Sequence, residues 1–354
     1  MSLALPTRMR SLVKSEPRPG LTLAELPVPE PGPRDVLIRV ETAGICGTDL
    51  HIFAWDPWAA GRVHPGRVVG HEFMGRVAAV GAAVRSVRPG QRVSGEGHIG
   101  CGHCYCCRTG RGHICDRVDI IGIDVDGCFA DYVRLPEENV WPLRDQISDA
   151  VGAMHDPLGN AMHTVAVQPV SGRSVAVTGA GPVGLLCAAI ASAHGALDVV
   201  VLDVNPLRLE LAREMGADAV FDPRDPSTAE AVRARTSDGR GVDVLLEASG
   251  SAEAIHLGLG LLRSGGHAAL LGLPSRPVTL DLPDEVIFKG VTIHGVNGRQ
   301  MFETWYQVDA VLRSGRIRPE RVVSHRLPLE AFREAFDLLG RGEAVKILLD
   351  VAPR

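Results

Sequence analysis

A glycine-rich turn at residues 179–184 (Gly-Ala-Gly-Pro-Val-Gly) joins an apolar run to a helical stretch near the middle of this 354-residue chain. Near-continuous apolar strands between helices indicate a parallel sheet that is covered on both faces. The expected strands and helices alternate at Val175–Thr178, Val183–His194, Val199–Asp203, Leu207–Met215, Val242–Glu247, Ala252–Leu262 and His267–Leu271. The turn and the alternation together predict a doubly wound, Rossmann-type domain.

The same turn predicts where a dinucleotide binds. Gly179 permits the tight bend, Gly181 lets the backbone approach a pyrophosphate, and Gly184 lets the helix pack closely on the sheet. The helix that follows presents unpaired N–H groups to the phosphates. The predicted cofactor residues are Gly179, Gly181, Pro182, Val183, Gly184, Asp203, Arg208, Leu271 and Arg299.

Asp203 indicates which dinucleotide to expect. It ends the next predicted strand, 19 residues after Gly184, where a carboxylate accepts hydrogen bonds from the adenosine ribose. Because this charge repels a 2′-phosphate, the sequence favours NAD over NADP. Arg208 follows a few residues later and leaves NADP open as the alternative.

Four cysteines are spaced C-x-x-C-x-x-C-x-x-x-x-x-x-x-C, at Cys101, Cys104, Cys107 and Cys115. Tetrahedral Zn²⁺ is held tightly by such a set of thiolates. The first three also suit an iron–sulfur cluster, but nothing else in the sequence indicates electron transfer. Four cysteines leave no open position for a substrate, so we predict a structural zinc on a lobe over about residues 95–118. Cys106, beside them, is expected to be an inert spare thiol.

Length and composition restrict the remaining possibilities. A chain of 354 residues with 45% hydrophobic and 22% charged residues is typical of a globular protein with two domains. A net charge of −5 gives no reason to expect nucleic acid or an anionic membrane as a partner. No apolar run approaches the ~18 residues that span a bilayer. Met1–Leu12 has arginines but no long apolar core, so we expect no signal peptide and a cytoplasmic location with free thiols.

The two ends of the chain differ from its middle. The first ~150 residues are expected to be β-rich, with strands at Val36–Val40 and Gly75–Val80 among many Gly and Pro turns. Near the other end, apolar spacing predicts amphipathic helices at Met301–Leu312 and Leu329–Leu339 and a final strand at Val345–Val351.

Residues 70–84 follow the pattern G-H-E-x-x-G-x-x-x-x-x-G-x-x-V. This string resembles the zinc signature of the medium-chain dehydrogenase/reductase superfamily, and the resemblance covers nearly the whole chain. It implies a GroES-like catalytic domain at residues 1–160 and 298–354, a Rossmann NAD-binding domain at residues 161–297, and catalytic zinc in the cleft between them. It also implies two zinc ions per chain and a homotetramer that acts on a small-molecule substrate.

By this resemblance, Cys46 and His71 are ligands of the catalytic zinc. A carboxylate from Asp156 or Glu72 joins them. We expect Asp156 to bind in the resting enzyme, with Glu72 close by and able to exchange with solvent or substrate. Three protein ligands leave one position open for the reacting alcohol.

Other catalytic roles also follow from the resemblance. Thr48 and His51 match the family's proton relay, which passes the alcohol proton through the nicotinamide ribose to an imidazole, and His98 is expected to face the substrate. The alternatives are a surface histidine at position 51 and a histidine at position 98 that packs beneath the lobe. Arg299 is expected to serve cofactor or substrate, with a surface salt bridge as its alternative.

Three longer strings resemble one branch of the superfamily, whose members oxidise the C3 hydroxyl of L-threonine to 2-amino-3-oxobutanoate with NAD⁺. They lie at Ser94–Ile99, Asp156–Ala161 and Gly298–Tyr306. The first alternative is a polyol or other secondary-alcohol dehydrogenase of the same superfamily. A more distant one is a non-catalytic nucleotide-binding sensor, which would have no use for a proton relay.

Overall fold

The computed structural model describes residues 5–352, which divide into two compact units. The first unit runs to Asp156 and resumes at Val323, and the second covers Pro157–Val322. The first four residues of Met1–Leu12, the segment in which no signal peptide is expected, lie outside the described residues. No helix among residues 5–352 is long and apolar enough to cross a membrane.

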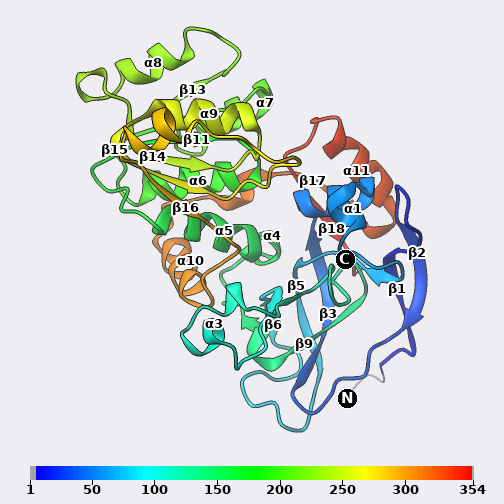
Figure 1. Ribbon diagram of the computed structural model, residues 1–354. Helices are drawn as coiled ribbons and strands as arrows, with labels where there is room; N and C mark the ends of the chain where they lie inside the picture. The colour runs from blue at the N-terminus through cyan, green and yellow to red at the C-terminus, as the bar shows by residue number, and fades with distance from the viewer. Residues whose placement is uncertain (1–4, 353–354) are drawn as a thin grey trace. The chain divides into compact units, whose positions relative to one another are not determined.

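The first unit is rich in strands, as predicted, and most of them pair antiparallel (Figure 1). Its largest sheet has the order β10-β6-β5-β3-β18-β17, and β9 also pairs with β3. Two smaller sheets have the orders β2-β1-β4 and β7-β8. The strands are β1 (Arg8–Lys14), β2 (Thr22–Pro27), β3 (Asp35–Gly44), β4 (Arg67–Val68), β5 (Glu72–Val80), β6 (Arg92–Gly95), β7 (His98–Ile99), β8 (Asp119–Ile120), β9 (Tyr132–Pro136), β10 (Val140–Pro142), β17 (Val323–Pro328) and β18 (Lys346–Asp350).

Strand β3 is the centre of this unit because both of its faces are covered. Val36, Leu37 and Ile38 are fully buried although neighbouring side chains point to opposite faces of a strand. The predicted strands Val36–Val40 and Gly75–Val80 are confirmed within β3 and β5. Short helices surround the sheets: α1 (Gly47–Ala54), α2 (Pro57–Ala60), α3 (Tyr105–Arg108), α4 (Asp149–Ala153) and α11 (Phe332–Gly340).

The second unit is a parallel sheet with the order β13-β12-β11-β14-β15-β16. This is the 3-2-1-4-5-6 order of a Rossmann fold, so the predicted doubly wound domain is confirmed. Helix α6 packs on β11 and β12, and α9 packs on β14 and β11. The strands are β11 (Ser174–Thr178), β12 (Asp198–Leu202), β13 (Ala219–Phe221), β14 (Val242–Glu247), β15 (Leu262–Leu270) and β16 (Thr292–Gly295). The helices are α5 (His155–Ala166), α6 (Pro182–Ala193), α7 (Pro206–Glu214), α8 (Thr228–Ala234), α9 (Ala252–Leu261) and α10 (Glu303–Ser314).

Several boundaries differ from the expected ones: the second unit begins at Pro157 and not at residue 161, and α10 covers Glu303–Ser314 and not Met301–Leu312. The second unit ends at Val322 and not near residue 298. The reason is that Arg299 and Trp305 pack against α5, where a Cβ added to Gly159 would lie 2.6 Å from atoms of both side chains. In addition, the helix expected over Leu329–Leu339 begins as a 3₁₀ turn at Leu329–Ala331 and becomes α-helical only from Phe332.

Candidate active site

Strand pairing in the first unit gathers a thiol, an imidazole and a carboxylate. Cys46 follows β3 and precedes α1, while Glu72 begins β5 and lies opposite Gly44 of β3. One ligand atom each from Cys46, His71 and Glu72 lies within 4.8 Å of the others. This donor set suits Zn²⁺, which accepts sulfur, nitrogen and oxygen ligands and keeps an open position in catalytic sites.

Asp49 supports this group, although the sequence analysis missed it. Its Oδ2 accepts a hydrogen bond from the Cys46 N–H at 2.9 Å, and its Oδ1 lies 3.8 Å from His71 Nδ1. Burial raises the pKa of Asp49 to about 6. Burial lowers the pKa of His71, but the charges of Asp49 and Cys46 raise it to about 10. The surroundings of His71 therefore favour a positive charge at this position. The signal for Asp49 was its place three residues after Cys46, one helical turn away.

Lys346 is a second residue that the sequence analysis missed. It is 1% exposed, and its ammonium donates to the Ile45 carbonyl at 2.8 Å and to Glu72 Oε2. Burial lowers the pKa of this lysine, but the charges of Glu72, Cys46 and Asp49 and the hydrogen bond to Glu72 together outweigh that effect and leave the pKa raised. A lysine directly before the apolar run Ile347–Leu349 of the predicted final strand was the available signal, because lysine is rarely buried without a partner.

Asp156 lies close to the group but outside the set of three ligand atoms. It is 4% exposed, and its negative charge is one of the causes of the raised His71 pKa. The structure therefore brings Glu72 within 4.8 Å of the other two donors and leaves Asp156 as a buried neighbouring carboxylate.

The residues expected to move the proton lie on α1 (Gly47–Ala54). Thr48 Oγ1 is 3.9 Å from Cys46 Sγ, which puts the hydroxyl beside the metal-binding group. The His51 side chain is 38% exposed, and its Nδ1 lies 2.5 Å from Asp56 Oδ2. His51 is therefore half-buried with a carboxylate partner and is not an isolated surface histidine.

His98 is a buried residue of β7 with a fixed ring. Its Nδ1 lies 3.1 Å from Glu96 Oε1, and the same oxygen accepts the His98 backbone N–H at 2.9 Å. The Asn139 amide donates to the carbonyls of both residues at 2.8 Å. These contacts hold the imidazole in one orientation.

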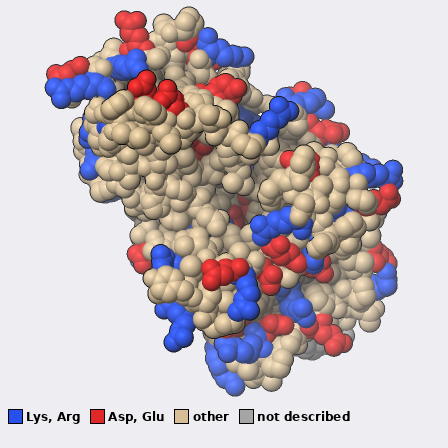
Figure 2. Space-filling view, in the orientation of Figure 1, with Lys and Arg blue, Asp and Glu red and all other residues tan. Residues whose placement is uncertain are grey.

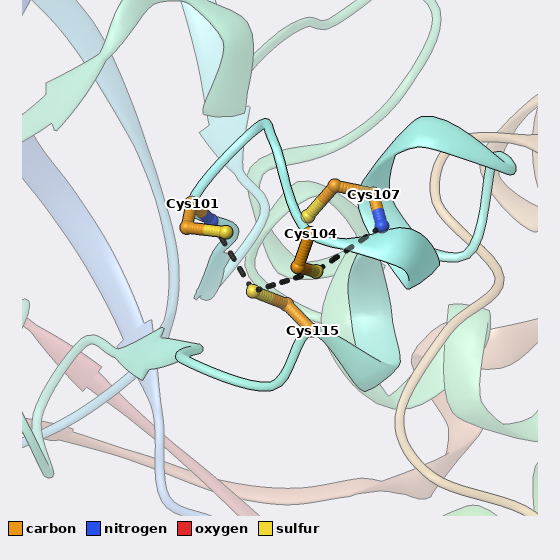
Figure 3. Close-up of side chains that lie close together, drawn as sticks. All are labelled: Cys101, Cys104, Cys107 and Cys115. Carbon is orange, nitrogen blue, oxygen red and sulfur yellow. Dashed lines mark hydrogen bonds between the residues drawn. The ribbon is translucent and has the colours of Figure 1, made fainter.

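The four cysteines of the lobe turn toward one another (Figure 3). Cys104 Sγ and Cys115 Sγ are 3.7 Å apart. A tetrahedral zinc with Zn–S bonds of about 2.3 Å sets its sulfur atoms about 3.8 Å apart, so the cluster fits the ion. Backbone N–H groups of His103 and Cys104 lower the pKa of Cys101 to about 6, which favours the thiolate that binds metal.

The glycine-rich turn has the geometry expected of a pyrophosphate site. Gly179 has a φ of +88°, and a Cβ there would lie 2.7 Å from Ser249. A Cβ on Gly184 would overlap the Gly179 carbonyl oxygen, whereas Gly181 has no atom within 4 Å of its Cβ position. Gly181 is also the N-cap of α6, so the first N–H groups of this helix receive no hydrogen bond from a capping side chain.

The Asp203 carboxylate braces this turn. Its Oδ2 accepts from the Ala180 N–H at 2.6 Å, and its Oδ1 accepts from the Asn205 N–H at 2.8 Å. This bracing role was not predicted from the sequence. On the next helix, the Nε of Arg208 is buried and has no hydrogen-bond partner among the described residues.

The last two predicted cofactor residues also belong to the second unit. Leu271 follows β15, and its N–H donates to the Glu247 carbonyl at 2.9 Å, so it lies at the carboxyl end of the parallel sheet. Arg299 is 2% exposed and donates from Nη1 to Asn160 Oδ1 at 3.2 Å. The alternative of a surface salt bridge at Arg299 is therefore wrong.

Comparison with known proteins agrees with this geometry. The family model of the alcohol dehydrogenase GroES-like domain matches residues 32–145, and that of the zinc-binding dehydrogenases matches residues 182–314. An L-threonine 3-dehydrogenase of Symbiobacterium thermophilum is 46% identical over 344 residues, which are 96% of this chain and 97% of the relative.

Two solved structures have the same fold over nearly the whole chain. An alcohol dehydrogenase of Thermus sp. ATN1 is 36% identical with a TM-score of 0.84, covering 97% of this chain and 100% of its own. An alcohol dehydrogenase of Escherichia coli CFT073 complexed with NADH is 27% identical with a TM-score of 0.89, covering 98% and 100%. The chain therefore belongs to the zinc-binding dehydrogenases of the medium-chain dehydrogenase/reductase superfamily.

Proposed function

We propose that this enzyme oxidises the C3 hydroxyl of L-threonine to 2-amino-3-oxobutanoate and transfers the hydride to NAD⁺, releasing one proton. The observation that carries the proposal is the 46% identity to an L-threonine 3-dehydrogenase over 96% of the chain. The thiol of Cys46 and the imidazole of His71, with two carboxylates close by, supply the metal-binding features that this reaction needs, and the glycine-rich turn supplies the dinucleotide-binding ones.

Charge balance supports Asp156 as the carboxylate ligand of the catalytic zinc. The thiolate of Cys46 and the carboxylate of Asp156 would neutralise Zn²⁺, with the imidazole of His71 as the third ligand. Glu72 is already neutralised by the buried ammonium of Lys346. In this arrangement Lys346 holds the Glu72 carboxylate close to the metal position. From there Glu72 can exchange with solvent or substrate as a ligand.

The zinc, when bound, acts as a Lewis acid that lowers the pKa of the substrate hydroxyl. The residues of this chain then move the proton. Thr48 lies beside Cys46. Its Oγ1 accepts the hydroxyl proton and releases its own proton toward His51. His51 takes up a proton at Nε2 and, because its side chain is 38% exposed, releases it to water.

Substrate and cofactor contacts are assigned to fixed, polar side chains. His98 is held by Glu96 and is assigned to the polar groups of the amino acid. Asp203 keeps a carboxylate beside the dinucleotide turn and favours NAD. Arg208 and Arg299 are assigned to the cofactor. A second, structural zinc in the four-cysteine lobe brings the count to two per chain.

A polyol or other secondary-alcohol dehydrogenase remains the nearest alternative, because the metal-binding group serves any secondary alcohol. A non-catalytic sensor is disfavoured by the membership in a dehydrogenase family and by the Thr48 hydroxyl beside Cys46. Figure 2 shows positive and negative side chains intermixed over the visible face, which accords with a small-molecule substrate and no nucleic-acid partner.

We assign a homotetrameric assembly and a cytoplasmic location to the enzyme. Strand β16 is an edge strand of the parallel sheet, and Leu282, Ile287 and Phe288 before it are 54%, 65% and 80% exposed. An edge strand beside exposed apolar side chains is a surface that another copy of the chain would cover. The cysteines are all unpaired in the structure, as suits a reducing compartment. Sedimentation velocity should give one species of four chains.

The Cys46→Ser variant tests the assignment of the catalytic metal. Turnover should fall by more than about 100-fold, since loss of a ligand exceeds the usual effect of outer-shell changes. Zinc content should fall from two ions to one per chain, while NADH binding, followed by fluorescence, stays within about twofold. Undiminished turnover would contradict the proposal, and so would loss of the fold together with NADH binding.

A further inference from the structure

We propose that Asp56 is a positioning residue for His51, holding its imidazole so that Nε2 receives the proton that leaves the substrate. This inference rests on the proton-transfer role given to His51 in the proposed function. Asp56 belongs to none of the motifs used above, and it is identified by its contacts alone.

The backbone between the two residues brings the carboxylate to the imidazole. Helix α1 ends at Ala54. Its C-cap Trp55 has a left-handed backbone, with a φ of 55° and a ψ of 47°, and this turns the chain back on the helix. The Asp56 N–H then donates to the His51 carbonyl at 3.3 Å. The two side chains are also hydrogen-bonded, with Asp56 Oδ2 2.5 Å from His51 Nδ1. The pair is therefore fixed at both backbone and side chain.

The other carboxylate oxygen of Asp56 is fixed as well. Its Oδ1 accepts the Ala59 N–H at 2.9 Å and so caps the short helix α2. Burial raises the pKa of Asp56, but the Ala59 N–H and the His51 hydrogen bond outweigh it and leave the pKa below its usual range. The group that faces His51 is therefore a carboxylate anion.

Trp58 completes the surroundings of the imidazole. Its ring centroid is 6.0 Å from that of His51, with 62° between the ring planes, which is an edge-to-face contact. The side chains of His51 and Asp56 are 38% and 26% exposed. The ring is thus confined by its neighbours and still reaches water.

This arrangement determines which nitrogen takes part in proton transfer. A carboxylate accepts but does not donate, so the neutral imidazole carries its proton on Nδ1 and leaves the Nε2 lone pair available. When a proton arrives at Nε2, the imidazolium is stabilised by the adjacent anion. One proton then leaves from Nε2 to water, and Asp56 remains a carboxylate throughout.

The Asp56→Asn variant distinguishes the positioning role from a purely structural role as the cap of α2. Asparagine caps a helix about as well as aspartate, so the hydrogen bond from Ala59 is retained. The amide, however, presents a donor to His51 Nδ1 and favours the opposite tautomer. The substitution thus separates the cap from the orientation of the imidazole.

A double-mutant cycle tests the inference. The kcat for L-threonine is measured for the wild type, Asp56→Asn, His51→Gln and the double variant, together with KM values and thermal midpoints. We expect Asp56→Asn to lower kcat about 10-fold to 100-fold, with both KM values within about twofold. In the His51→Gln background the same substitution should cause no further loss, because residues that act through one another are not additive. Should Asp56→Asn not fold, Asp56→Ser, which also caps a helix, takes its place.

Asp124→Asn is the matched control. Asp124 also accepts a backbone N–H, from Ile120 at 2.9 Å, and pairs with a cation, Arg62 at 2.8 Å, but it lies outside the site. Its kcat should equal that of the wild type. If His51→Gln leaves kcat unchanged, the proton-transfer role of His51 is wrong. If His51→Gln lowers kcat but Asp56→Asn does not, or lowers it equally in both backgrounds, the positioning role of Asp56 is overturned.

Discussion

Gly181 and Gly184 lie three residues apart in one turn, yet the space around them differs. A Cβ on Gly184 would overlap the Gly179 carbonyl oxygen, so this glycine is needed for packing within the protein. The Cβ position of Gly181 meets no atom within 4 Å, so the protein alone does not require glycine there. Its open surroundings are the space that we assign to the pyrophosphate.

Alanine substitutions at these two positions should therefore have separate effects. Gly184→Ala should lower the thermal midpoint of the cofactor-free enzyme by roughly 4–8 °C, because overpacking costs about 1–3 kcal/mol. Gly181→Ala should leave the midpoint within ~1 °C but raise the Kd for NAD⁺ about 10-fold or more, which is ~1.4 kcal/mol. Calorimetry and fluorescence titration measure the two quantities. Equal loss of stability in both variants would contradict this division.

At the residue scale, the glycine turn was predictable from its local spacing, whereas the Cys46 and His71 donors were predicted from the resemblance to the superfamily. Asp49 was visible in principle, since it lies one helical turn from Cys46. Lys346 was not, because its partner Glu72 is 274 residues away in the chain. Only the pairing of β18 with β3, which in turn pairs with β5, brings the two side chains together.

Among the elements, the four-cysteine lobe is the one that a bound zinc would stabilise most. Helix α3 (Tyr105–Arg108) contains four residues, none of them buried, so apolar packing contributes little to it. Cys104 caps this helix by accepting the Cys107 N–H on its sulfur, and a serine at that position keeps a capping side chain. Substitution at Cys104 therefore removes the metal ligand while retaining a cap.

Cys104→Ser should lose the structural zinc, with the zinc content falling from two ions to one per chain. The thermal midpoint should drop by at least roughly 5 °C, since structural zinc contributes directly to folding. Cys106→Ser is the control, because Cys106 neighbours the cluster without belonging to its four ligands. Zinc analysis of both proteins measures the outcome. A full zinc content in Cys104→Ser, or an equal loss in Cys106→Ser, would refute the assignment.

Most elements of the Rossmann unit were predictable because apolar runs alternate with helical stretches, although β13, α8 and β16 were not among the expected segments. The end of the unit was not predicted either. Arg299 and Trp305 join it through contacts with Gly159, about 140 residues earlier, and no local pattern records such a contact. The 3₁₀ turn at Leu329–Ala331 was hidden for a related reason, since its apolar spacing continues that of the helix that follows.

For the whole molecule, the family and the substrate are supported by different observations. The family models and the parallel-sheet order establish a zinc-binding dehydrogenase of two units. The donor group around Cys46 suits any secondary alcohol, so the choice of L-threonine depends on polar contacts to its ammonium and carboxylate groups. A site that pairs such groups discriminates strongly against analogues that lack them.

The most direct test of the account is kcat/KM of the zinc-loaded enzyme with NAD⁺, compared between L-threonine, butane-2,3-diol and sorbitol. We predict that L-threonine is preferred by at least about 100-fold, because two charged groups of the substrate are recognised. An equal or higher kcat/KM for butane-2,3-diol or sorbitol would contradict the proposed substrate while leaving the dehydrogenase assignment intact.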